Sequence, residues 1–189
     1  MTNQRHLPTR RAFGAFALAG ILAACASAPV VQSQPQRGIL QILADDSSFS
    51  RFTTAAERAG VAQALGGAGT YTVFAFTNSG WEELPGFLRE SLMSDTERLR
   101  LAAVINNLIV DGRHTIASMG GQVQTYTTRN GSRLTVDPRQ AGRITVESAG
   151  GGGLGAGVAS VGLRSARLIR QDIEASNGVI HVLDSIIVP

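Results

Sequence analysis

Three residues near the C-terminal end of the chain are of the types that serine hydrolases use for catalysis. Ser176 has a hydroxyl group, His181 an imidazole and Asp184 a carboxylate. His181 and Asp184 are three positions apart on an expected strand, where residues i and i+3 point to opposite faces. The chain also has no Gly-x-Ser-x-Gly turn, the usual position of a nucleophilic serine. We therefore predict no catalytic residues, and interpret His181 as a core or edge histidine.

Metal sites are not expected either. The His residues are at positions 6, 114 and 181, and the last two have no Cys or paired carboxylates near them at ligand spacing. The acidic pairs Asp45-Asp46 and Glu82-Glu83 are adjacent in sequence, so helix or loop geometry sends their side chains apart. We interpret both pairs as solvated surface and predict no metal ion.

A glycine-rich run occupies residues 150–157. It lacks the Gly-Lys-Ser/Thr ending of a phosphate-binding loop and does not open a helix in a βαβ unit. We predict a flexible connection between two strands, and no cofactor.

The charge of the chain does not indicate a nucleic-acid partner. All 17 basic residues are Arg. Three of them lie in the first 24 residues, so the remainder carries 14 Arg against 14 acidic residues and is balanced. No Arg cluster alternates with aromatic residues as a base-stacking surface would require.

The N-terminus has the pattern of an export signal. Arg10 and Arg11 belong to a basic segment, and the apolar run 12–24 that follows is too short to span a bilayer. The sequence Leu22-Ala23-Ala24-Cys25 is similar to the lipobox of bacterial lipoproteins. We therefore predict a signal peptide over residues 1–24 and a diacylglycerol on Cys25, which would attach the protein to a membrane.

Export and anchoring leave several alternatives open. The two adjacent arginines also resemble a twin-arginine export motif, which general secretory signals can share. Cys25 is the only cysteine, so no disulfide can form within the chain. Residues 25–37 contain Pro29 and Pro35 and are expected to form a flexible tether. The expected location is the outer membrane, the periplasm or the cell surface.

The first half of residues 38–189 has helical patterns. Phe49, Phe52, Ala56 and Ala59 recur at helical spacing. We expect Ser47 or Ser48 to begin this helix and Gly60 to end it, with a short second helix through Leu65.

Two capping boxes are expected further along. Asn78 or Ser79, with Glu82, would begin a helical turn directly after a strand. Ser94 and Glu97 would begin a helix with one buried face, formed by Leu101, Val104, Ile105 and Leu108.

Strand patterns occur once in the first half and dominate the second. The expected strands are 71–76, 123–128, 134–137, 144–147, 158–161, 166–173 and 179–187, with Asn130-Gly131 turning a hairpin. Helices followed by strands predict a single α+β domain over residues 38–189.

Two blocks of this domain resemble the signature boxes of the fasciclin (FAS1) domain family. The first contains Thr72, Val73, Phe74, Ala75, Thr77 and Asn78. The second contains Asn177, Gly178, Val179, Ile180, His181, Val182, Asp184 and Pro189. In the second, Asn177 and Gly178 tolerate a positive φ and are expected to form the turn before a buried strand. The resemblance implies the FAS1 fold, with the helices of the first half packed on a wedge-shaped, sandwich-like sheet core.

The chain departs from the family pattern at several positions. Phe76 stands where the first box has a proline, Asn78 where it has an aspartate, and Trp81 is its aromatic residue. Asn107 and Leu108 replace a Tyr-His pair implicated in receptor contacts of animal homologues. Such an epitope is therefore not expected here.

The resemblance implies a non-catalytic adhesion or matrix-interaction module. It would contact an extracellular polysaccharide or protein that the sequence does not identify. The alternative is a carrier of a small apolar, carotenoid-like ligand, because some fasciclin-type proteins resemble carotenoid binders. A carrier needs an apolar cleft lined by aromatic residues, and Phe, Tyr and Trp make up only 5% of the chain.

Overall fold

The fold is α+β, with the helices concentrated in the first half. A computed structural model describes residues 37–139, 145–149 and 165–189. The helices are α1 (Ile39–Asp45), α2 (Ser50–Arg58), α3 (Ala62–Leu65), α4 (Asn78–Glu82), α5 (Gly86–Leu92) and α6 (Arg98–Asn106). Short 3-10 helices are η1 (Ser47–Phe49), η2 (Asp95–Glu97) and η3 (Ala117–Met119).

The strands of the described residues form a seven-stranded sheet in which neighbouring strands are hydrogen-bonded, in the order β2-β1-β7-β6-β5-β4-β3. Their bounds are β1 (Tyr71–Phe76), β2 (Ile109–Asp111), β3 (Gln124–Thr127), β4 (Arg133–Asp137), β5 (Thr145–Ala149), β6 (Ser165–Ala175) and β7 (Gly178–Leu183). All pairs are antiparallel except β1 and β7, which run parallel from Tyr71 opposite Gly178 to Phe76 opposite Leu183.

Strand β6 joins two layers of the sheet. Its first residues, 165–167, pair with β5, and residues 168–175 pair with β7 across two register shifts. The ends of the strand order also meet, because Val110 of β2 forms a bridge with Thr128, just after β3. These connections produce the sandwich-like core and pair one end of each edge strand.

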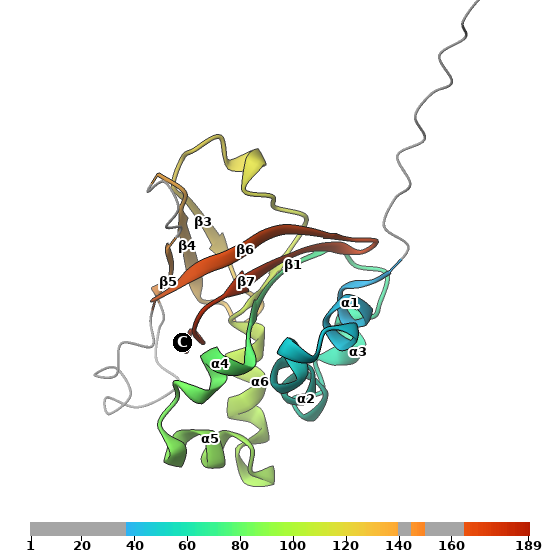
Figure 1. The fold of residues 1–189 in the computed structure, drawn as a ribbon, viewed down its shortest axis with the longest axis vertical. Coiled ribbons are helices and arrows are strands. Elements are labelled where there is room, and N and C mark those ends of the chain that lie inside the picture. Colours follow the sequence, from blue (N-terminus) through green and yellow to red (C-terminus); the bar gives the residue numbers. More distant parts are fainter. Residues whose placement is uncertain (1–36, 140–144, 150–164) are drawn as a thin grey trace, which may run out of the picture. The chain divides into compact units, whose positions relative to one another are not determined.

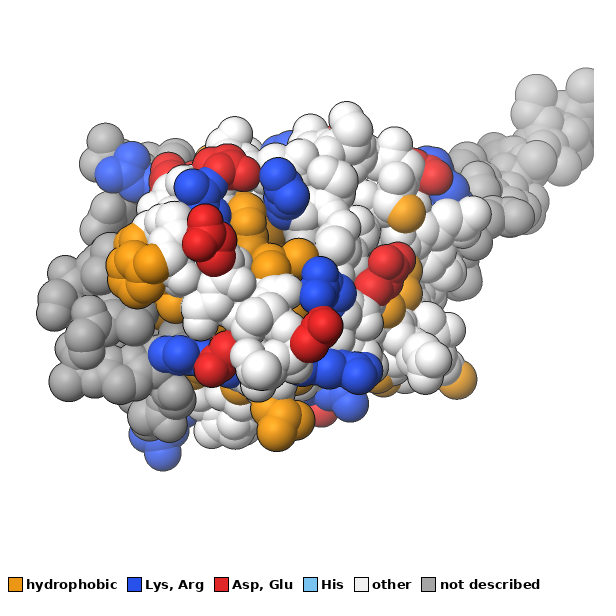
Figure 2. All heavy atoms as spheres, turned by 90° about the horizontal axis from the view of Figure 1, so that it is seen from below, with side chains coloured by type: hydrophobic (Ala, Val, Ile, Leu, Met, Phe, Trp, Pro, Cys, Tyr) orange, Lys and Arg blue, Asp and Glu red, His pale blue; other side chains and the backbone are white. Residues whose placement is uncertain are grey.

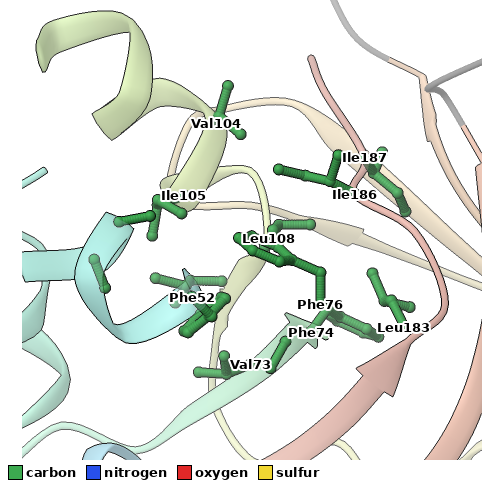
Figure 3. Packing of buried hydrophobic residues seen from close by; sticks show 14 of the residues in the cluster. Phe52, Val73, Phe74, Phe76, Val104, Ile105, Leu108, Leu183, Ile186 and Ile187 are labelled. Atoms are coloured by element: carbon green, nitrogen blue, oxygen red, sulfur yellow. The ribbon is translucent and has the colours of Figure 1, made fainter. Parts of the chain in front are cut away.

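The helices pack on the strands that carry the two signature boxes. In Figure 1, α1–α6 lie on one side of β1 and β7, and β3–β5 lie at the end of the sheet away from α1–α3. The core between them includes Phe52 of α2, Phe76 of β1 and Ile105 of α6 (Figure 3). Residues 186–188, which follow β7 without strand structure, are also buried. The helices and strands that supply this core lie far apart in sequence, so the fold depends on long-range packing.

The end of α2 is confirmed, but its expected beginning is wrong. Gly60 has φ 72°, its N–H donates to Glu57 and that of Val61 donates to Ala56, which is a Schellman ending. Neither Ser47 nor Ser48 begins α2, because 3-10 helix η1 precedes it. The side chain of Asp46 begins η1 by accepting a hydrogen bond from the Ser48 N–H.

The capping box expected at Ser94 and Glu97 does not form. The Ser94 hydroxyl donates to the Ser91 carbonyl oxygen at 2.7 Å, so it turns toward the preceding helix, and α6 begins only at Arg98. The buried face of α6 is confirmed. Leu108 is also buried, although it follows the helix and leads into β2, a strand that the sequence did not predict.

The predicted hairpin is confirmed, with Gly131 at φ 79° between β3 and β4. The final strand is shorter than predicted, because it ends at Leu183 rather than at residue 187. The expected strand 158–161, the glycine run 150–157, the signal peptide and Cys25 lie outside the described residues. Arg37, the last residue of the expected tether, already contacts the domain through its carbonyl oxygen, which accepts from the Ser176 N–H at 3.0 Å.

Candidate functional site

The two signature boxes lie side by side as the parallel strands β1 and β7. Thr72, Val73, Phe74 and Ala75 are fully buried, as are the residues Val179 to Val182 that face them. The boxes therefore hold the centre of the domain and present almost no surface to a ligand. Phe76, at the proline position of the first box, packs edge-on against Phe52 and stacks on Trp81, so this departure extends the aromatic core.

Asn177 connects the turn before β7 to the N-terminal helices. Its side-chain Oδ1 accepts from the Ile39 N–H at the start of α1 (2.8 Å), and Nδ2 donates to the Leu65 carbonyl oxygen at the end of α3 (2.6 Å). Of the two turn residues, both of which tolerate a positive φ, only Gly178 adopts one, with φ 150°. A Cβ on Gly178 would overlap the Tyr71 carbonyl oxygen, so this position requires glycine.

Asn78 connects the first box to the start of α2, as Asn177 connects the second box to α1. The side chain of Thr77, rather than that of Asn78 or Ser79, caps α4 by accepting from the Gly80 N–H. Asn78 instead accepts from the Arg51 N–H at 2.9 Å and donates to the Ser47 carbonyl oxygen at 2.9 Å. Each box thus contributes one Asn that binds the start of a distant helix, which the sequence did not indicate.

His181 is fully buried and both of its ring nitrogens are bound. Nδ1 accepts from the Asp172 N–H at 3.2 Å, and Nε2 lies 2.9 Å from the His114 carbonyl oxygen, to which it must donate. The ring is therefore neutral, and burial lowers its pKa. Asp184 accepts from the Arg167 N–H instead, and the structure brings neither it nor Ser176 to the imidazole.

Asp172 and Thr72 complete the contacts around His181. Asp172 was not predicted as a site residue, and Thr72 was predicted only as a member of the first box. Asp172 lies at a bulge of β6 with φ 54°, the only positive φ among the described non-glycine residues. Its carboxylate accepts from the Ile116 N–H at 2.8 Å, while the Thr72 hydroxyl oxygen accepts from the His114 N–H at 2.9 Å. These bonds hold the segment after β2 against both boxes. No periodic pattern in the sequence predicts such contacts, because they depend on backbone atoms of a loop that is distant in sequence.

Among the cavities lined by described residues, two open on the helical part of the domain. One, of about 400 Å³, lies between α2 and the start of α6 and is lined by Glu57, Arg58, Ser94, Asp95, Arg98 and Leu101. The other, of about 290 Å³, is the Trp81 pocket, lined by Arg51, Trp81, Glu82, Gly86, Arg89, Glu90 and Met93. Charged side chains are prominent in both, and only the second has an aromatic residue.

The sequence profile of the fasciclin domain matches residues 47–189. The chain belongs to the fasciclin domain family. Protein sll1483 of Synechocystis sp. is 28% identical over 159 residues, which cover 80% of this chain and 73% of that protein. Human Stabilin-1 is 31% identical over 159 residues, covering 82% of this chain but only 5% of Stabilin-1.

The FAS1 fold is shared with a solved structure, a FAS1 domain pair from the insect cell adhesion molecule Fasciclin I. The TM-score is 0.66 at 16% sequence identity, and the match covers 82% of this chain and 52% of that chain. This chain thus spans about half of that domain pair.

The surface of this fasciclin domain combines charged residues with a few exposed apolar ones. Figure 2 shows the side on which α5 lies, where basic and acidic side chains alternate with hydrophobic ones between them. Phe87 on α5 is 70% exposed and Leu99 on α6 is 87% exposed. Among the described residues, no three His, Cys, Asp or Glu side chains gather to hold a metal ion.

The acidic pairs are on the surface, as solvated faces would be. Asp45 pairs with Arg37 at 2.8 Å, and the pKa of Asp46 is lowered, mainly by the hydrogen bond from the Ser48 N–H. Glu82 pairs with two arginines at the Trp81 pocket. None of the helices in the described parts of the chain has the length and apolar character needed to cross a membrane.

Proposed function

We propose that this fasciclin domain is a non-catalytic adhesion or matrix-interaction module, held at a membrane by a lipid on Cys25. The observation that supports this proposal most is the engagement of the signature boxes within the core. His181 uses both nitrogens to hold the backbone, and Asn177 uses its amide to hold two helices. The polar side chains of the boxes are therefore already bonded within the fold, and a partner would have to bind the exposed surface instead.

The likeness to the insect cell adhesion molecule Fasciclin I supports the same proposal. A tethered domain with many copies on a membrane can bind a repeating partner well although each contact is weak. The expected partner is an extracellular polysaccharide or protein. The carrier of an apolar ligand is supported less, because charged side chains are prominent in both cavities.

Attachment of a deletion strain tests this function. The strain is complemented with the wild-type gene and, separately, with Cys25→Ala, and attachment to a surface and cell aggregation are measured. We expect attachment to fall in the deletion strain and to recover only with the wild type, because the variant would lack the lipid. Fractionation should find Cys25→Ala outside the membrane fraction. Unchanged attachment in all strains would contradict the adhesion function, and a membrane-bound variant would contradict lipid anchoring.

A further inference from the structure

The Trp81 pocket has the size and the side chains of a small-ligand site. It opens between α2, which contributes Arg51, and α5, which contributes Arg89 and Glu90. Its volume of about 290 Å³ lies just below the range of typical ligand pockets, about 300 to 1,000 Å³. A ligand of this size is a single six-membered ring with its substituents rather than an extended molecule.

The floor of the pocket is aromatic and rigid. Trp81 is only 4% exposed and stacks on Phe76, with ring centroids 5.6 Å apart and the planes 23° from parallel. Met93, half-buried, is the other apolar residue of the lining. The pocket thus combines a fixed indole with an adaptable thioether.

The wall of the pocket carries balanced charge. Arg51 lies 3.7 Å from the carboxylate of Glu82, and Arg89 forms an ion pair with the same carboxylate. Glu90 adds a second carboxylate, so two guanidinium groups face two carboxylates. An anionic ligand would have to displace Glu82 from both arginines, and a cationic ligand would meet the same two arginines. The pocket is therefore matched to an uncharged ligand.

Hydroxyl groups meet these requirements best. A hydroxyl donates to a carboxylate and accepts from a guanidinium, so a polyol can bond to both signs of charge around the wall. The C–H groups of a sugar ring can pack on Met93 and on the small part of the indole that the pocket exposes. We propose that the Trp81 pocket binds one unit of an uncharged polysaccharide. This inference rests on the proposed function, because it names the partner class of the adhesion module.

Phe87 extends the site along α5. It is 70% exposed, follows Gly86 of the pocket lining, and lies three residues before Glu90, so Phe87 and Glu90 share a face of the helix. An exposed aromatic ring beside the pocket can pack against the next unit of the same polymer. A polymer that touches both residues would gain affinity over a monosaccharide.

The single tryptophan of the chain makes a direct test possible. Trp81 is the only indole, so its fluorescence and its indole N–H resonance report on this pocket alone. The purified full-length chain is titrated with cellotetraose and mannotetraose as uncharged probes, and with tetragalacturonate as the anionic probe. We expect at least one uncharged tetrasaccharide to shift the indole signals with a Kd of about 1 mM, because only one or two of its sugar units would contact the protein.

Three variants locate the binding. Glu90→Ala and Phe87→Ala change exposed side chains, so both proteins should fold, and each should weaken binding about fivefold. Leu99→Ala is the matched control, because it removes an even more exposed apolar side chain, on α6, that does not line the pocket. Its Kd should equal that of the wild type.

The proposal is overturned if no uncharged probe shifts the indole signals of the wild type at about 20 mM, well above the expected Kd. A shift with tetragalacturonate alone, or equal Kd values for all three variants, would overturn it as well.

The same variants separate this inference from the adhesion function. If the wild type restores attachment but no uncharged probe binds, adhesion stands and the Trp81 pocket is not its site. If a probe binds at Trp81 but the deletion strain attaches normally, the pocket stands and the adhesion function fails. We expect Glu90→Ala to lower attachment and Leu99→Ala to leave it unchanged.

Discussion

The pair β1–β7 and the helical face around α5 use their side chains in opposite ways. In β1 and β7, residues such as Thr72, Phe74 and His181 are fully buried and contact other parts of the core. Around α5, Phe87 is 70% exposed and the charged groups of the Trp81 pocket line an open cavity. The comparison indicates that the buried strands of the signature boxes stabilise the fold, whereas the proposed binding surface lies around α5 and takes only Trp81 from the first box. Substitutions in the boxes should therefore change stability, and those around α5 should change binding with little effect on stability.

The largest effect is expected from Gly178→Ala. An added Cβ would overlap the Tyr71 carbonyl oxygen and lie 2.8 Å from its carbonyl carbon, so β1 and β7 could not keep their parallel register. We expect the free energy of unfolding to fall by about 4 kcal/mol or more, enough to prevent folding of a marginal domain. Urea unfolding followed by circular dichroism measures this change.

Gly131→Ala is the matched control for this variant. Gly131 also has a positive φ, 79°, but no atom lies within 4 Å of an added Cβ. Only the backbone conformation then opposes the substitution, at a cost of about 1 kcal/mol. Similar unfolding midpoints for the two variants would show that the close approach of Gly178 to Tyr71 does not determine the loss of stability.

The two Asn residues sharpen the comparison between the boxes. Asn177→Ala removes the partners of the Ile39 N–H and the Leu65 carbonyl oxygen at a partly buried site, and should cost about 2 to 3 kcal/mol. Asn78→Ala removes an exposed cap from α2 and should cost about 1 kcal/mol. Asn78→Asp keeps the acceptor for the Arg51 N–H and adds a negative charge at a helix start, but it loses the donor to the Ser47 carbonyl oxygen, so its stability should lie between those of the wild type and Asn78→Ala. Thermal unfolding of the three variants tests this order, and a larger loss for Asn78→Ala than for Asn177→Ala would contradict it.

Sequence periodicity and turn residues were sufficient for most of the fold. The buried face of α6, the end of α2 at Gly60 and the hairpin at Gly131 all follow from local patterns. The errors concern which partner a polar side chain bonds to, whether that partner is near in sequence or far. Ser94 has the correct type and spacing for a capping box, but its hydroxyl bonds to Ser91, and the Asn177 amide turns to two helices of the first half. A local pattern contains no information about which of several acceptors a side chain will reach.

The candidate site was less predictable than the fold. Trp81 was recognised as the aromatic residue of the first box, but not as the floor of a pocket. Arg51, Glu82 and Arg89 come from three helices, and only their packing brings the charges together. Exposed charged residues at helical spacing are common on any domain, so the sequence could not separate these from the remaining surface.

The smallest expected effect is a pH dependence that originates at His181. Burial lowers the pKa of His181 in the folded protein, while in the unfolded chain it should lie at about 6.5. The unfolded chain therefore binds a proton that the native state excludes as the pH falls below about 6.5. The stabilising contribution of the neutral imidazole is complete above that pH. It decreases as the pH falls toward the lower pKa of the folded state, by at most about 1.4 kcal/mol per pH unit.

We expect the free energy of unfolding of the wild type to fall by about 1 kcal/mol between pH 7 and pH 5.5, measured by urea titration at each pH. His181→Gln removes the titrating group but keeps an amide that can donate to the His114 carbonyl oxygen and accept from the Asp172 N–H. The variant should be less stable than the wild type at pH 7 and lose less stability on acidification, because it lacks the buried imidazole whose pKa is lowered in the folded state. Equal losses in the two proteins would mean that the buried imidazole does not govern acid stability. The Trp81 pocket lacks a histidine, so binding of an uncharged probe should stay unchanged over the same pH range while the domain remains folded.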